Sequence, residues 1–271
     1  MAKVKRYTKK RKTTGRSRPS QRRKHKNIFP RIFVSTLIVL AFVALGYFLF
    51  HYFYPEYNDF ENGSLARKYE VRGVDLSHHN EIISWSAIRE KDVTFAYLKV
   101  TEGTCMQDKE YERNYRLAKE NNIVVGTYHF FSFRTSGEEQ ARHFIRQAIC
   151  KKGDLRPAID VEHSPFNLYK KDKASRDKVV KELSVFEKRL RVYYGKYPVI
   201  YTNKECYDLY VKDNFPKNPI WICDLSKEPK NKIDNWVIWQ FSHTGKIQGT
   251  RGHIDLNYYR YSFEEFKKLL L

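Results

Sequence analysis

Cysteine is scarce in this sequence of 271 residues, and its placement excludes the commonest metal-binding patterns. The four cysteines, Cys105, Cys150, Cys206 and Cys223, lie far apart and form no CxxC pair. A zinc site of the usual ligand spacing is therefore not expected, and neither a metal nor a cofactor is predicted. An exported domain could join these cysteines in disulfides, whereas four free buried thiols fit the sequence equally well.

Acidic residues are absent from the first 31 positions, and this absence explains most of the formal net charge of +20. Residues 1–31 carry 14 of the 51 Lys and Arg, so the remainder holds 37 basic and 31 acidic residues. The remainder is thus only mildly basic, which argues against nucleic acid as a partner. We interpret the tail as a disordered cytoplasmic segment that fixes the orientation of the chain in a membrane and binds anionic lipid headgroups. The alternative is a tail that binds nucleic acid or a cytoplasmic partner.

Charged residues are also missing from the next 19 positions, 32–50, whose sequence is IFVSTLIVLAFVALGYFLF. A cleavable signal peptide has a shorter apolar region followed by a small-residue cleavage site, and this segment fits neither feature. The sequence therefore predicts an uncleaved transmembrane anchor over 32–54, with a buried core helix as the alternative. The positive-inside rule then places the N-terminus in the cytoplasm and residues 55–271 on the cell surface or in the periplasm.

Residues 55–70 are polar and contain Pro, Asn and Gly, which predicts a short linker before a domain that spans 71–271. No internal repeat is present, which excludes a solenoid. Short apolar runs instead alternate with amphipathic segments, the pattern of strand-helix units around a parallel sheet. The predicted strands are 71–76, 93–100, 123–131, 156–162, 197–202, 219–223, 236–241 and 253–257. The predicted helices are 84–91, 109–121, 137–150, 173–194, 205–210 and 263–271. Eight strands with most helices in the first half predict an irregular α/β barrel.

The fourth predicted strand carries two acids, Asp160 and Glu162, at its end. Residues i and i+2 of a strand face the same side, so the two carboxyl groups are expected to point together. Like-charge proximity raises the pKa of one member, which leaves a protonated acid beside an ionised partner. That combination is what glycosidic bond cleavage requires, although an exposed strand end or a cation-binding pair would give the same tripeptide.

Two further acids, Asp75 and Asp255, lie near the ends of the first and last predicted strands. The C-terminal strand ends of such a barrel converge on one face, so four acids are expected to form one cluster. Side chains on which sugar rings could stack or to which they could hydrogen-bond are expected on the same face. They are Tyr128, Tyr201, Trp221, Trp239 and Gln240.

The sequence resembles glycoside hydrolase family 25, the muramidases also called Chalaropsis-type lysozymes, over residues 71 to about 260. The motifs that carry the resemblance are GVDLS at 73–77, FAYLKVTEG at 95–103, GTYHF at 126–130, PAIDVE at 157–162, WQFS at 239–242 and DLN at 255–257. The resemblance implies a TIM-like barrel of five strand-helix units followed by three strands. It also implies hydrolysis of the β-1,4 bond between N-acetylmuramic acid and N-acetylglucosamine in peptidoglycan.

The resemblance also implies roles for the acids. Glu162 would be the general acid, Asp160 the carboxylate that orients the reacting sugar, and Asp75 and Asp255 the remainder of the acidic cluster, while Tyr128 would line the substrate groove. The stereochemical course stays open, with attack by the substrate's own N-acetyl group as the preferred route. The alternative functions are a wall-binding scaffold that does not cut glycan and a glycosidase of another N-acetylhexosamine polymer such as chitin.

Overall fold

The computed structural model describes residues 29–53, 60, 63–80, 83–165, 167–168, 172–229, 233, 235–247 and 250–271. Contacts within the chain divide it into two compact units, Met1–Phe53 and Tyr54–Leu271. The first unit contains the apolar helix α1 (Phe29–Phe53), which takes in the last three positions of the predicted basic tail. The rest of that tail lies outside the described residues. Among the residues that were described, no helix is both long and apolar enough to cross a membrane.

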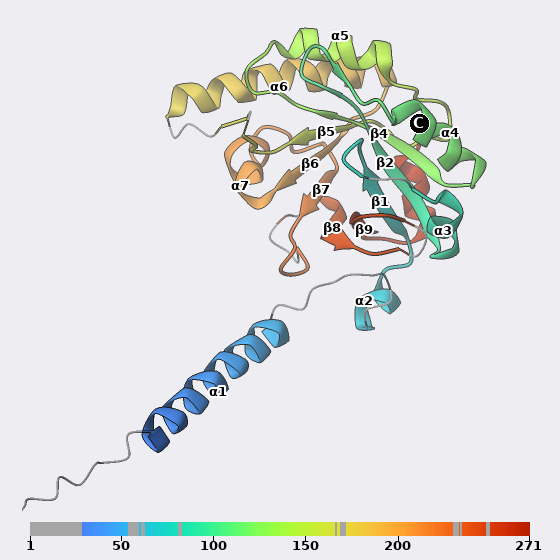
Figure 1. The fold of residues 1–271 in the computed structure, drawn as a ribbon. Helices are drawn as coiled ribbons and strands as arrows, with labels where there is room; N and C mark the ends of the chain where they lie inside the picture. The colour runs from blue at the N-terminus through green and yellow to red at the C-terminus, as the bar shows by residue number, and fades with distance from the viewer. Residues whose placement is uncertain are drawn as a thin grey trace, which may run out of the picture. The chain divides into compact units, whose positions relative to one another are not determined.

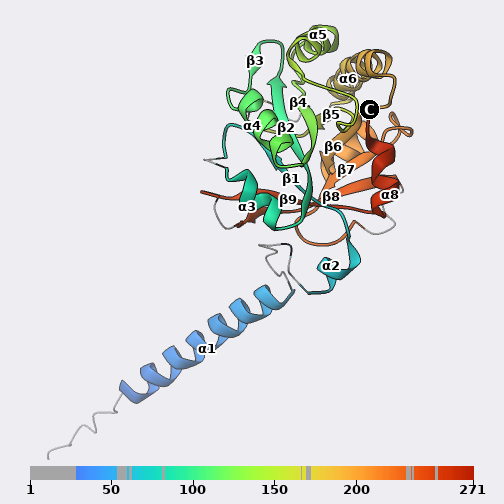
Figure 2. The same cartoon turned by 90° about the vertical axis from the view of Figure 1, so that its right-hand side faces the viewer.

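The second unit is a closed barrel of eight strands, which confirms the strands predicted from the sequence (Figures 1 and 2). The strands are β1 (Arg72–Leu76), β2 (Val93–Glu102), β4 (Val124–Phe130), β5 (Ala158–Val161), β6 (Val199–Asn203), β7 (Ile220–Cys223), β8 (Trp236–Gly245) and β9 (Ile254–Tyr259). Neighbours from β1 through β8 run parallel. The last strand, β9, closes the barrel by pairing antiparallel with both β8 and β1.

Helices follow the first five barrel strands. They are α3 (Trp85–Glu90), α4 (Tyr111–Glu120), α5 (Gly137–Gln147), α6 (Lys173–Tyr194) and the short α7 (Lys204–Cys206), which continues into a π-helical turn, Tyr207–Val211. α5 and α6 lie side by side against the outside of the barrel (Figure 1). The final predicted helix is shorter than expected, because α8 (Phe263–Phe266) passes into a 3₁₀ turn at Lys267–Leu269.

Two short elements were not predicted. β3 (Met106–Gln107) folds back on the end of β2, and α2 (Gly63–Lys68) lies inside the predicted linker. On either side of α2, Phe60 and Tyr69 are buried, and the ring of Tyr69 stacks on Tyr258 with centroids 5.1 Å apart. The end of the predicted linker is thus part of the folded unit, because two of its aromatic side chains pack against the outer face of β9.

Large aromatic side chains fill the interior of the barrel and form the floor of the site described below. Phe95 and Tyr97 alternate inward along β2, and the ring of Tyr97 stacks on Trp221 at 4.8 Å. Glycine at two facing positions makes room for these rings, since a Cβ on Gly73 would lie 2.1 Å from the Phe95 ring and one on Gly126 would lie 2.3 Å from Tyr97. The interior is therefore a packed core, and an active site can form only at the end of the barrel where the parallel strands terminate.

Candidate active site

The four predicted acids come together at one end of the barrel. They line a single cavity of about 80 Å³ together with three of the predicted aromatic residues. The lining residues are Asp75, Tyr128, Asp160, Glu162, Tyr201, Trp221 and Asp255. A cavity of this size has room for a few water molecules. Seven of the nine side chains expected at the site are therefore found at one place, although they come from six different strands.

Asp255 lies at this end of the barrel, but the prediction that it lies near the C-terminal end of its strand is wrong. It is the second residue of β9 and lies near the strand's N-terminal end. Because β9 runs antiparallel to β1, its beginning lies beside the C-terminal end of β1, where the Cα of Asp255 is paired with that of Asp75. The cluster forms as expected, but through a reversed strand.

Asp75 and Asp255 form a hydrogen-bonded pair that shares a proton. Burial and the neighbouring charge of Asp75 raise the pKa of Asp255 to about 9, so at neutral pH it is protonated and donates to Asp75. Asn257 Nδ2 and Gln240 Nε2 also donate to Asp75 Oδ2, at 2.7 and 3.0 Å. Burial raises the pKa of Asp75, and these three donors counteract that effect. The shared proton therefore lies on Asp255, and the three donors favour the ionised form of Asp75.

Asp160 and Glu162 form the second pair. Burial, followed by the charge on Asp75, raises the pKa of Glu162 to about 7. Burial and then the charge on Glu162 raise the pKa of Asp160 well above its ordinary value. Within the described part of the chain, Asp160 Oδ1 is buried without a hydrogen-bond partner. The pair holds a proton at neutral pH beside a cavity, which is the arrangement of a general acid with a neighbouring carboxyl group.

Lys99 is a member of this site to which the sequence analysis gave no role. Its Cα is paired with that of Tyr128 on β4, and its side chain is only 7% exposed. The ammonium group lies 2.7 Å from Glu102 and lowers the pKa values of both Asp160 and Glu162. The alternation of β2 contained the signal, because Lys99 follows the inward residues Phe95 and Tyr97 at spacings of two.

Asn257 is the second residue whose role was missed. Besides donating to Asp75, it accepts a hydrogen bond of 2.7 Å from Trp221 Nε1. It lies two positions after Asp255 on the same strand and so faces the same side. Asn257 therefore links the aromatic floor of the barrel to the acidic pair above it.

The last two predicted binding residues, Gln240 and Trp239, are adjacent on β8 and face opposite sides of the barrel wall. Gln240 faces the interior, where it accepts a 2.8 Å hydrogen bond from the Tyr201 hydroxyl and donates to Asp75. Trp239 faces the outer core: its Nε1 donates to the Asp224 carbonyl, and its ring lies 6.2 Å from that of Tyr69. Gln240 thus positions an acid, while the substrate contact predicted for Trp239 is not realised.

All four cysteines are free thiols in the structure. Across the ranges described above, no three His, Cys, Asp or Glu side chains are grouped as metal ligands. The site consists of carboxyl, amide, phenol and indole groups, together with one buried ammonium group.

Comparisons with known proteins agree with this geometry. Residues 74–250 match the family model described as "Glycosyl hydrolases family 25". The uncharacterized protein YegX of Escherichia coli (strain K12) is 30% identical over 209 residues, covering 75% of this chain and 74% of that protein. Lysozyme M1 of Streptomyces globisporus is 28% identical, covering 69% of this chain and 67% of that protein. A solved family 25 glycosyl hydrolase from Bacillus anthracis is 37% identical, covers 75% of this chain and 94% of that one, and superposes with a TM-score of 0.67. With four carboxyl groups at one end of a barrel that β9 closes antiparallel, and with relatives of this kind over most of its length, the chain belongs to glycosyl hydrolase family 25.

Proposed function

We propose that the barrel domain is a muramidase, which hydrolyses the β-1,4 bond between N-acetylmuramic acid and N-acetylglucosamine in peptidoglycan. The observation that carries the proposal is the position of the half-buried Glu162 carboxyl group, which lines one cavity with three other acids. Burial and the charge on Asp75 raise its pKa to about 7, which favours retention of a proton. Relatives named lysozyme and N,O-diacetylmuramidase support the assignment of the substrate.

In the proposed reaction Glu162 donates its proton to the oxygen of the leaving sugar. The anomeric carbon is attacked by the carbonyl oxygen of the substrate's own N-acetyl group, and Asp160 accepts a hydrogen bond from the amide N–H during that attack. Water then opens the cyclic intermediate with Glu162 acting as base, so that the configuration is retained. Burial, and then the charge on Asp75, raise the pKa of Glu162 and so favour its protonated form, while Asn257 and Gln240 hold Asp75 in place.

The test is digestion of defined peptidoglycan by the full-length protein, with mass spectrometry of the released fragments. Fragments that end in a reducing N-acetylmuramic acid identify the cleaved bond, whereas reducing N-acetylglucosamine ends would refute it. Glu162→Gln is expected to lower the rate by about 10² to 10⁴, the usual contribution of a general acid. Glu90→Gln, on the exposed face of α3, is the matched control and should retain full activity. NMR of the first-formed product tests the route, because an inverted anomer excludes it.

We also propose that residues 32–54 anchor the protein in the cell membrane with the barrel domain outside the cytoplasm. The support comes from the sequence alone, because no described helix is both long and apolar enough to cross a membrane. In the sequence, 19 uncharged residues follow a tail that carries 14 basic residues and no acids. The same tail is proposed to bind anionic lipid headgroups. Protease added to intact cells without an outer envelope should degrade the barrel and spare the tail. Release of the whole protein by alkaline carbonate would contradict the anchor.

A further inference from the structure

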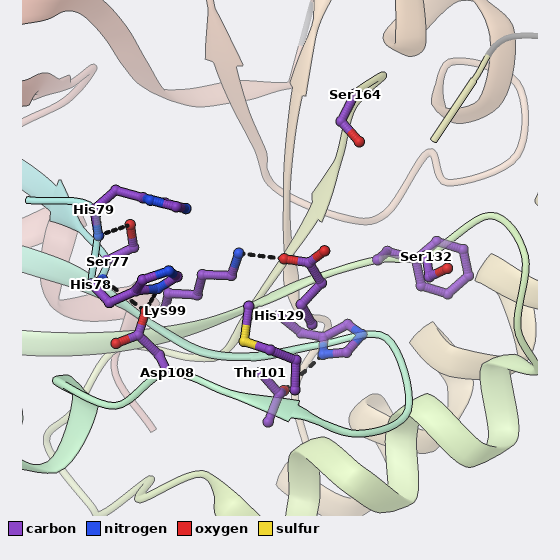
Figure 3. Close-up of polar contacts among 12 residues, drawn as sticks. Ser77, His78, His79, Lys99, Thr101, Asp108, His129, Ser132 and Ser164 are labelled. Atoms are coloured by element: carbon purple, nitrogen blue, oxygen red, sulfur yellow. Dashed lines mark hydrogen bonds and ion pairs between the residues drawn. The ribbon is translucent and has the colours of Figure 1, made fainter. Parts of the chain in front are cut away.

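A basic cluster lies beside the acidic cavity, and two of its three members, both histidines, have no part in the mechanism above. It consists of His78 and His79, in the loop after β1, and Lys99 on β2. Figure 3 shows the two imidazole rings on the same side as the Lys99 side chain. None of the three residues lines the cavity, but the cluster adjoins two residues that do: His78 follows Asp75 by three positions, and Lys99 is paired with Tyr128.

His78 is held in one orientation by a buried acid. Asp108, whose side chain is 1% exposed, accepts hydrogen bonds of 2.8 Å from both the backbone N–H and the ring Nδ1 of His78. The same carboxylate accepts a third bond, of 3.0 Å, from the backbone N–H of Glu110. With Nδ1 committed to Asp108, the ring position and tautomer of His78 are fixed, and Nε2 faces away from the acid.

His79 lies against this fixed ring. The two ring centroids are 4.0 Å apart, and His79 is exposed to solvent. Partial burial and the nearby His78 and Lys99 lower the pKa of His79. Among the residues that the structure describes, the His79 ring nitrogens have no hydrogen-bond partner. His79 therefore presents a ring N–H that is available to an anionic or strongly accepting oxygen.

The two sugars of peptidoglycan differ at one position, and a hydrogen-bond donor could distinguish them there. N-acetylmuramic acid carries a lactyl ether on O3, and N-acetylglucosamine carries a hydroxyl group there. The acyl end of the lactyl group is a carboxylate on peptide-free strands and an amide carbonyl where a stem peptide is attached. Both forms present an acceptor oxygen to a hydrogen-bond donor beside the acidic cavity.

We propose that His79, supported by the Asp108-oriented His78, binds the acyl oxygen of the 3-O-lactyl group and so selects muramic acid at the cleavage site. The inference rests on the proposed muramidase function and assigns its substrate selectivity to a loop outside the acidic cluster. His79 acts as a binding residue, and Asp108 positions it through His78.

The experiment is a cycle of two changes, one in the protein and one in the ligand. Binding is measured by calorimetry with the full-length chain carrying Glu162→Gln, so that no ligand is cut. The first ligand is a peptide-free tetrasaccharide of alternating N-acetylglucosamine and N-acetylmuramic acid. The second is the same tetrasaccharide with its lactyl carboxylates reduced to alcohols, and the third has them converted to alanyl amides.

Reduction of the carboxylates is expected to weaken binding about tenfold when His79 is present, the effect of losing one charge-assisted hydrogen bond. After His79→Ala the acid and the alcohol should bind within about twofold of each other, because the two changes remove the same contact. If the amide ligand binds as tightly as the acid, His79 contacts the carbonyl oxygen. If it binds as weakly as the alcohol, the contact depends on the negative charge. Lys188→Gln, which removes an exposed charge on α6, should leave the tenfold ratio intact.

An equal effect of reduction with and without His79 would overturn the proposal, as would the absence of any effect of reduction. Loss of folding is checked by thermal melting and is not expected, because His79 is exposed. The cycle is independent of cleavage. If the Glu162-intact protein fails to release muramic acid ends, the proposed function fails, and the binding ratios report separately on the lactyl contact.

Discussion

The pH dependence of hydrolysis follows from the environment of Glu162. An ordinary glutamate, with a pKa of 4.5, would be only about 0.3% protonated at pH 7. With the pKa of about 7 that burial and the charge on Asp75 give it, Glu162 is about 90% protonated at pH 6 and about 10% protonated at pH 8. Since the proton must be present for catalysis, kcat/KM should fall by nearly tenfold between these two pH values.

The change that tests this reasoning is Lys99→Met. The buried ammonium group lowers the pKa of Glu162, and its removal also leaves Glu102 without its partner, which adds negative charge. Both effects raise the pKa, so the alkaline limb of the profile should move upward by about one pH unit, the lower end of the range for loss of a nearby opposite charge. Methionine retains most of the volume of the lysine side chain.

The assay is kcat/KM on a soluble, fluorescently labelled glycan strand from pH 4 to 10, with Lys188→Met as the control for loss of a remote surface charge. Two results would refute the argument. An alkaline limb near pH 4.5 in the parent protein would show that burial does not hold the proton on Glu162. A limb that stays in place or moves downward in Lys99→Met would show that the ammonium group does not act on this acid.

Three further predictions concern stability. Asp255→Asn should stabilise the protein increasingly as pH rises from 5 to 8, by at most about 1.4 kcal/mol per pH unit. The reason is that Asp255 ionises near pH 3.8 in the unfolded chain but keeps its proton to about pH 9 in the folded one. A gain in melting temperature that does not grow with pH would contradict this. Asn257→Ala removes a donor from Asp75 and should cost about 2–4 kcal/mol in urea denaturation, and an unchanged midpoint would rule out that role. Gly126→Ala places a Cβ 2.3 Å from the Tyr97 ring and should cost about 1–3 kcal/mol, and adding Tyr97→Leu should recover part of it; purely additive losses would argue against the clash.

The strands of the barrel were predictable because each one is a short apolar run between turn or helix signals. All eight were found, and the aromatic and glycine positions inside them follow from strict alternation. β3 and α2 were missed for a physical reason: a two-residue strand has no periodicity, and α2 lies in a polar segment whose flanking Phe60 and Tyr69 are buried only through long-range contacts.

The site was predictable where chemistry and strand ends coincide, as for Asp160 and Glu162. Direction was harder to infer, because nothing local indicates that β9 runs antiparallel. Trp239 was misassigned since the sequence does not say which face of β8 is inward, and its neighbour Gln240 occupies that face. Lys99 was overlooked because a lysine is ordinarily exposed, although its spacing from Tyr97 places it inside the barrel.

The antiparallel closure by β9 also couples assembly of the fold to activity. The register that pairs Asp75 with Asp255 is the one that completes the ring of hydrogen bonds, so both acids are in place only when the last strand has docked. A slip of one residue would turn Asp255 and Asn257 to the outer face, removing two of the three donors to Asp75. A chain that stops short of residue 254 therefore lacks the acidic pair, and under the mechanism proposed above it stays inactive until its last strand has docked.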